Sequence, residues 1–193
     1  MNDFVTEIER YLTELSDIIG RLDRGQIDSA MNALMDAYES GGRVFVFGNG
    51  GSAATASHFV CDFNKGVSMN LKKKFEFICL SDNVPTMLAI ANDCGYEHVF
   101  SMQLEDRLRG NDVILAISGS GNSKNVIKAV EYAKTKGNTI IALVGYDGGK
   151  LLGLADLPIH VNVNDMQKVE DVHMVLDHLM SQIIAEKLGQ KMC

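Results

Sequence analysis

The sequence contains no apolar run that approaches the length of a membrane-spanning helix, and its acidic N-terminus does not resemble a signal peptide. It contains no internal linker, repeat or low-complexity segment, so residues 1–193 are interpreted as a single domain. Its four cysteines form no CxxC pair, which disfavours thiolate zinc sites and disulfides and predicts packing thiols. Together these absences indicate a protein of the reducing cytoplasm with no membrane partner.

An excess of positive charge is also absent. The chain has 18 Lys and Arg against 25 Asp and Glu, a formal net charge of −7. This balance disfavours a duplex-binding surface, so no nucleic-acid partner is expected. The only basic cluster, Lys72-Lys73-Lys74, is interpreted as a solvated loop. The apolar share of 46% is ordinary for a globular domain and suffices for a full core.

Helical periodicity dominates the first forty residues. Residues 4–22 carry apolar side chains at helical spacing, and residues 27–38 repeat the pattern until Gly41-Gly42 ends it. The first of these helices has many apolar positions for a helix at one end of a domain. Residues 1–40 are therefore predicted to be oligomerising helices, with capping of the sheet as the alternative.

From residue 43 onward, short apolar runs alternate with helical patterns. Near-continuous apolar strands are typical of parallel sheets that are covered on both faces. The pattern predicts an α/β fold, a three-layer α/β/α sandwich with a five-stranded parallel sheet whose ligands bind at the carboxyl ends of the strands. The expected strands are 43–47, 75–80, 113–117, 139–144 and 159–163, and the expected helices are 52–65, 84–91, 97–109, 123–136 and 168–188.

A glycine turn follows the first expected strand and leads directly into a helix. Such a turn leaves unpaired N–H groups at the start of the helix, where the dipole also favours an anion. The turn Asn49-Gly50-Gly51-Ser52 is therefore a candidate phosphate cradle, and its residues are expected to bind substrate. His58 and Asp62 follow four residues apart on one helix face, so a metal-binding or proton-transfer pair is expected about one and a half turns from the phosphate.

A second loop of the same kind, Ser118-Gly119-Ser120-Gly121-Asn122-Ser123, follows the third expected strand. Three serine hydroxyls and turn amides suit a phosphate dianion. One such loop is usually only a turn, but two after strands of one sheet favour phosphate binding. Ser118, Gly119, Ser120 and Ser123 are therefore expected to contact the substrate.

A dinucleotide-binding fold is the nearest competitor, because residues 48–53 formally match G-x-G-x-x-A after a strand. The acidic candidate after the next strand, Asp82, stands about thirty residues on, whereas that fold places it about twenty residues on. The second serine loop also has no role in that scheme. We therefore expect no nucleotide cofactor.

The two loops, together with a late helix that carries histidines, resemble the sugar isomerase (SIS) domain family and, within it, the phosphoheptose isomerases. The resemblance extends over nearly the whole chain and includes residues 91–96, 122–129 and 147–150. It implies an aldose–ketose isomerase that converts sedoheptulose 7-phosphate into D-glycero-D-manno-heptose 7-phosphate through an enediolate. It also implies a homotetramer with active sites at subunit interfaces, and a role in making heptose for a surface polysaccharide.

The resemblance also implies roles for particular residues. Asp62 and His178 would be catalytic, and Asp93 and Glu170 would join the two loops in binding the substrate. A divalent metal, zinc in some members of the family, would be held by His58, Asp62, Glu170 and His178. Glu170 and His178 lie about 80° apart around a helix, so they can share a face.

Three positions depart from the family pattern. Asp62 stands where the family has Glu, Glu170 where it has Gln, and Gly66, beside Lys65, where it has Arg. These departures keep two alternatives open. One is an isomerase of another phosphosugar. The other is a non-catalytic regulator like the SIS branch associated with replication initiation, which lacks the early carboxylate and the late histidine.

Each candidate side chain also has a structural interpretation. His58 could simply donate to a backbone carbonyl, and Glu170 could be an acid favoured by the first turn of a helix. His178 lies among apolar residues, where a buried and satisfied histidine is equally expected. His173 is interpreted as structural, and His98 gives no signal.

Overall fold

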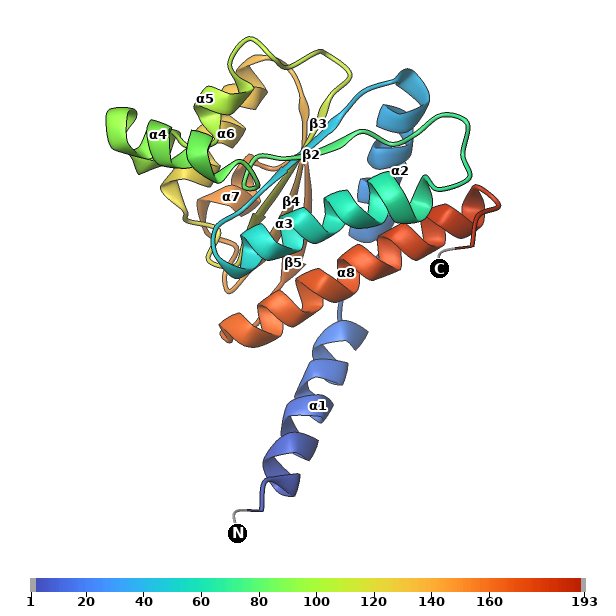
Figure 1. Ribbon diagram of the computed structural model, residues 1–193. Coiled ribbons are helices and arrows are strands. Elements are labelled where there is room, and N and C mark those ends of the chain that lie inside the picture. Colours follow the sequence, from blue (N-terminus) through green and yellow to red (C-terminus); the bar gives the residue numbers. More distant parts are fainter. Residues whose placement is uncertain (1–2, 192–193) are drawn as a thin grey trace.

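The computed structural model describes residues 3–191, and a sheet of five parallel strands forms its centre (Figure 1). The strand order is β2-β1-β3-β4-β5, which confirms the predicted three-layer fold. All residues of β1 and β3 are buried, because helices cover both faces of the sheet. The strands are β1 (Val44–Phe47), β2 (Phe77–Cys79), β3 (Val113–Ser118), β4 (Thr139–Gly145) and β5 (Leu157–Val161).

Alternate residues of each strand enter two separate cores. Val44 and Val46 of β1 pack on one side of the sheet, while Phe45 and Phe47 pack on the other. The first core is covered by α2 (Arg24–Ser40), α3 (Gly51–Cys61) and α8 (Met166–Lys187). The second is covered by α4 (Val84–Cys94), α5 (Ser101–Leu104), α6 (Lys124–Thr135) and α7 (Gly149–Leu154).

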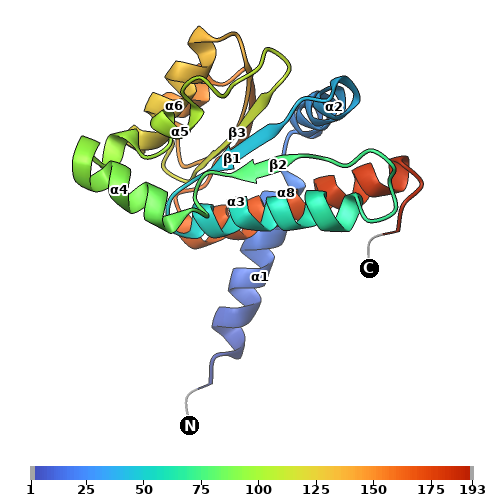
Figure 2. The ribbon, with the colours of Figure 1, turned by 45° about the horizontal axis from the view of Figure 1, so that its top comes forward.

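Helices α3 and α8 lie side by side on the first face and run in the same direction (Figures 1 and 2). Their contact therefore brings residues 51–62 opposite residues 170–181, in the same order along both helices. This pairing is the part of the fold on which the candidate site depends.

Helix α1 (Val5–Gly20) projects away from the body of the molecule (Figure 1). Only its last turns join the core, through Ile18. The middle of the helix contacts α8 through Tyr11, whose hydroxyl donates a hydrogen bond of 2.5 Å to Asp171 Oδ2. Val5, Ile8 and Leu12 are 58%, 55% and 59% exposed. Residues 1 and 2 of the predicted oligomerising segment lie outside the described residues.

The helix expected at 97–109 is wrong. The structure has a short 3₁₀-helix, η2 (Tyr96–His98), then the four-residue α5, and Asp106 adopts a left-handed conformation with φ 55°. Such a conformation does not continue a right-handed helix. The sequence pattern also missed α7, which is six residues long; its N-cap Gly148 and its first residue Gly149 both have positive φ.

Helix α3 continues as a π-helix, η1 (Asp62–Val67), so the helix expected at 52–65 is confirmed but changes its winding at Asp62. Beyond this point, Asn64 reaches the edge strand β2. Its Nδ2 donates to the Phe77 carbonyl and its Oδ1 accepts from the Phe77 N–H, both at 2.8 Å. The π-helical segment is thereby joined to the outer edge of the sheet.

The cysteines are free thiols, as expected, at the three positions that the structure describes. The prediction that they pack in the interior is wrong for Cys61 and Cys94, which are exposed. Cys79 is half-buried, and this burial raises the pKa of its thiol to about 12. Cys193 lies outside the described residues. Within residues 3–191, none of the helices has the length and hydropathy that crossing a membrane would require.

Candidate active site

The two glycine–serine loops meet at the point where the strand order reverses. Strand β1 pairs with β2 on one side and β3 on the other, so the loops that follow β1 and β3 are neighbours. Open parallel sheets bind their ligands at such a switch point, outside the carboxyl ends of the strands. The fold therefore brings together the two segments that the sequence singled out separately.

The first loop is built to bring its backbone close to β3. A side chain at Gly48 would collide with the Ile117 carbonyl, and Gly50 has φ 54°, which favours glycine. Gly50 is the N-cap residue of α3 and supplies no side-chain acceptor for the first helical N–H groups. Ser52 is buried two residues further on. The first N–H groups of α3 thus have no side-chain cap from Gly50, as an anion-binding helix start requires.

The second loop presents hydroxyls around a tight turn. Ser118 Oγ donates to Ser123 Oγ at 3.2 Å, and Ser120 Oγ accepts from the Asn122 N–H at 3.3 Å. Gly119 is packed against Met166, so a larger residue there would collide with α8. The three serines gather on one short segment, as a phosphate cradle needs.

Asn49 joins the two loops. It exchanges two hydrogen bonds with Asn125, of 2.9 and 2.8 Å, and its Oδ1 also accepts from the Tyr96 hydroxyl at 2.7 Å. Most of its hydrogen-bonding capacity is thus used within the protein. Asp93 is exposed near the end of α4, where it accepts from Asn92 at 2.7 Å.

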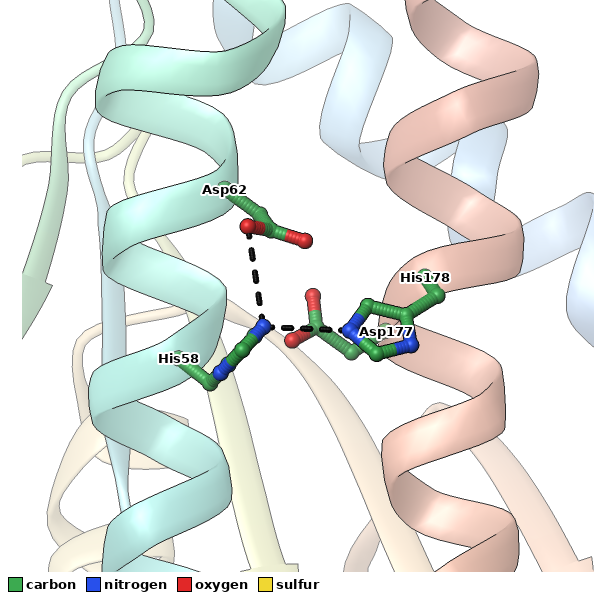
Figure 3. A group of neighbouring side chains, drawn as sticks. All are labelled: His58, Asp62, Asp177 and His178. Atoms are coloured by element: carbon green, nitrogen blue, oxygen red, sulfur yellow. Dashed lines mark hydrogen bonds and ion pairs between the residues drawn. The ribbon is translucent and has the colours of Figure 1, made fainter. Parts of the chain in front are cut away.

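His58, Asp62 and His178 converge in the gap between α3 and α8 (Figure 3). The Nε2 atoms of the two histidines are 3.1 Å apart, and His58 Nε2 is 3.7 Å from Asp62 Oδ1. Ser181 Oγ lies 3.4 Å from Asp62 Oδ2, within donating distance. The change to π-helical winding at Asp62 occurs at this point, and such irregularities are frequent at functional sites.

A fourth residue, Asp177, belongs to this group and was missed by sequence reasoning. One of its oxygens lies within 4.8 Å of the ligand atoms of His58, Asp62 and His178. The side chain is fully buried. This burial, and then repulsion from Asp62, raises the pKa of Asp177 to about 8. The available signal was its position four residues after the buried His173, on the apolar face of α8.

Glu170 lies apart from these four residues. Its carboxylate sits against Gly51, where any side chain would collide with it. Eight residues separate Glu170 from His178, which is about 12 Å along a helix axis. Within one chain, Glu170 therefore faces the first loop and the start of α3.

A cavity of about 560 Å³ opens beside the His/Asp group. Asp62 and His178 line it together with polar residues of the last turns of α8, including Gln182 and Glu186, and with Gln190 and Lys191 beyond the helix. Solvent and small polar molecules can therefore reach the two residues that the sequence predicts to be catalytic.

The molecule is thus a parallel α/β domain with two glycine–serine loops at its switch point and a His/carboxylate group between α3 and α8. The sequence profile of the SIS domain matches residues 5–145. This chain belongs to the SIS domain family, and the predicted resemblance is confirmed.

The relatives narrow the similarity within that family. A phosphoheptose isomerase of Citrifermentans bemidjiense is 38% identical over 165 residues, which are 86% of this chain and 85% of that protein. The structure of a phosphoheptose isomerase from Neisseria gonorrhoeae is 28% identical with a TM-score of 0.87, covering 95% of this chain and 100% of the other. One from Francisella tularensis has a TM-score of 0.88 at 27% identity, covering 96% and 100%.

Proposed function

We propose that this chain is an aldose–ketose isomerase that converts sedoheptulose 7-phosphate into D-glycero-D-manno-heptose 7-phosphate. The observation that carries the proposal is the spacing along α3. Ser52, in the phosphate-binding turn, precedes His58 by six residues, or about 9 Å of helix. An extended sugar phosphate held by the loops can therefore reach the His/Asp group with its carbonyl end. The names of the relatives point to the same reaction.

The chemistry requires a proton to leave the carbon next to the carbonyl and another to arrive at the neighbouring carbon. A carboxylate and an imidazole can serve as the two acid/base groups, because both exchange protons near neutral pH when suitably placed. We assign these roles to Asp62 and His178, which line the same cavity. The loop serines would hold the phosphate, while Asn49, Ser52, Asp93 and Glu170 would contact the sugar chain.

We also propose a divalent metal, with Zn²⁺ as the first candidate. Two imidazole nitrogens 3.1 Å apart with a carboxylate beside them form a donor set that suits Zn²⁺ or a similar ion. His58, Asp62 and His178 would hold it. When bound, such an ion polarises the carbonyl and stabilises negative charge on the neighbouring oxygens.

A homotetramer with active sites at subunit interfaces is part of the proposal. The apolar face of α1 (Val5, Ile8 and Leu12) is open to solvent in a single chain, and such faces mark sites of association. The free thiols agree with the expected cytoplasmic location. The product would supply heptose for a surface polysaccharide.

Turnover of sedoheptulose 7-phosphate by the purified protein, with and without a chelator, tests the function. The companion variant is His178→Gln, which keeps a neutral polar side chain but removes the titratable imidazole. It should abolish isomerisation and leave phosphosugar binding nearly intact. Turnover of a different ketose or aldose phosphate would indicate another substrate, which the replacement of Arg by Gly66 makes worth testing. Tight binding without turnover of any phosphosugar would favour the regulatory alternative.

A further inference from the structure

Asp177 is a buried carboxylate that has no hydrogen-bond partner. Neither of its side-chain oxygens has a partner among residues 3–191, and the residue is 0% exposed. A buried carboxylate normally accepts hydrogen bonds or pairs with a cation, because its desolvation is otherwise uncompensated. Burial of Asp177 therefore lowers the stability of the fold unless a ligand compensates for its desolvation.

Among residues 3–191, neither oxygen of the Asp177 carboxylate is bonded to a positive side chain. The ionisable groups that gather with it between α3 and α8 are His58, Asp62 and His178, and their ligand atoms all lie within 4.8 Å of one another (Figure 3). Two carboxylates so close together repel each other unless a cation lies between them. The arrangement has the form of a binding site for a positive ion.

We propose that Asp177 is the fourth protein ligand of the divalent metal. It takes the ligand role that the family resemblance assigns to Glu170. The donors are then two imidazole nitrogens and two carboxylate oxygens, all from α3, η1 and α8 of one chain. Glu170 stays at the opposite end of the site, beside Gly51, where it can contact substrate. This inference rests on the metal-assisted isomerase proposed above.

The assignment has a distinctive consequence for stability. Without metal, Asp177 is a buried acid with no hydrogen-bond partner among residues 3–191, so it adds no stabilising contact. With metal, its carboxylate is neutralised by the ion and contributes a ligand bond to the folded state. Asp177→Asn should therefore reduce the rise in melting temperature that Zn²⁺ produces.

The test measures metal binding directly, in the absence of substrate. Zn²⁺ affinity is measured by competition with a chromophoric chelator for the full-length wild type, Asp177→Asn and Glu170→Gln. Glu170→Gln is the matched control, since it removes one negative charge from the same helix. Asp177→Asn should weaken Zn²⁺ binding at least about 100-fold. Loss of a residue that only hydrogen-bonds to a metal ligand typically weakens metal binding by about 10- to 100-fold. Glu170→Gln should bind Zn²⁺ like the wild type.

Co²⁺ substitution distinguishes a ligand from a neighbour of a ligand. The visible absorption of bound Co²⁺ depends on its coordination, so loss of a ligand in Asp177→Asn should change the spectrum. An unchanged spectrum with weaker binding would mean that Asp177 only positions a histidine, and would overturn the inference. Wild-type affinity in Asp177→Asn, or an equal loss in Glu170→Gln, would overturn it too.

Turnover measured on the same samples separates this inference from the proposed function. A wild type that isomerises its substrate but binds no divalent metal would refute the metal site and leave the isomerase. A wild type that binds metal through Asp177 but turns over no phosphosugar would support the site and refute the isomerase.

Discussion

The Nε2 atoms of His58 and His178 lie 3.1 Å apart although 120 residues separate them in the chain. Neither helix alone holds the pair, since one imidazole comes from α3 and the other from α8. The parallel packing of these helices thus creates the group on which the proposed chemistry depends. The two glycine–serine loops follow β1 and β3, and the first of them precedes His58 by about two turns of α3.

The first prediction concerns the length of the acid/base side chain. Asp62 Oδ1 stands 3.7 Å from His58 Nε2, beyond hydrogen-bond length. Asp62→Glu adds one methylene and restores the family residue, so kcat should be retained or raised. Asp62→Ala should lose activity by at least the ~100-fold typical of a lost general acid or base. Steady-state kinetics on both variants checks this, and a Glu variant as inactive as the Ala variant would refute the assigned role.

The second prediction concerns the phosphate. Ser120→Ala should weaken binding of sedoheptulose 7-phosphate by about 1–3 kcal/mol, because a hydrogen bond to a charged group is lost. Binding of unphosphorylated sedoheptulose should change little. Calorimetry with both sugars provides the measurement, with Ser29→Ala on the exposed face of α2 as the matched serine control. Equal losses for the two sugars would contradict the cradle.

The third prediction concerns assembly. The double variant Ile8→Asp/Leu12→Asp places two charges on the exposed apolar face of α1, and should dissociate a tetramer into smaller species. The control Thr6→Asp/Thr13→Asp adds the same charge roughly 120–140° round the helix from the centre of the Ile8/Leu12 face, and should leave the assembly intact. Sedimentation velocity at micromolar concentration distinguishes the species. A monomeric wild type would rule out the proposed tetramer.

The fourth prediction concerns acid stability. Burial lowers the pKa of His173 to about 4 from its ordinary 6.5, so between these values the unfolded chain binds a proton that the native protein excludes. The free energy of unfolding should therefore fall as pH drops through this window, by on the order of 3 kcal/mol for this group. Its stabilising effect is complete above pH 6.5.

A difference measurement isolates this effect. Asp177 has the opposite effect on stability. Burial raises its pKa to about 8, so in the metal-free protein its contribution to the free energy of unfolding falls as pH rises. Both the wild type and His173→Leu contain Asp177. The difference between their free energies of unfolding in urea, measured from pH 4 to 7, therefore cancels the contribution of Asp177. The wild type should lose stability relative to His173→Leu towards pH 4. A constant difference across the range would show that His173 does not titrate as described.

Much of the fold could be predicted because its signals are local. Near-continuous apolar runs indicated each parallel strand, and glycines after β1 and β3 marked the two loops. His58 and Asp62 could be paired from their spacing alone, since four residues make neighbours on a helix. The resemblance to the SIS family then added His178, which no local pattern distinguishes from a buried structural histidine.

The rest depends on tertiary contacts that local patterns do not contain. The left-handed Asp106 interrupts a segment whose spacing indicated one helix. Glu170 and His178 share a face of α8, yet the place of Glu170 beside Gly51 follows only from the packing of α8 on α3. Asp177 looks like an ordinary surface acid until its burial is known.

The two hydrogen bonds between the Asn64 side chain and the Phe77 backbone protect the exposed edge of the sheet. Strand β2 is an edge, and an edge with free N–H and C=O groups can recruit a strand from another molecule and start aggregation. The Asn64 amide occupies both backbone groups of Phe77, as a neighbouring strand would. β2 has only three residues, and the backbone groups of the first, Phe77, are already bonded to Asn64, so another strand has little backbone left to pair with. The segment that begins at Asp62 thus also protects the protein from self-association at this edge.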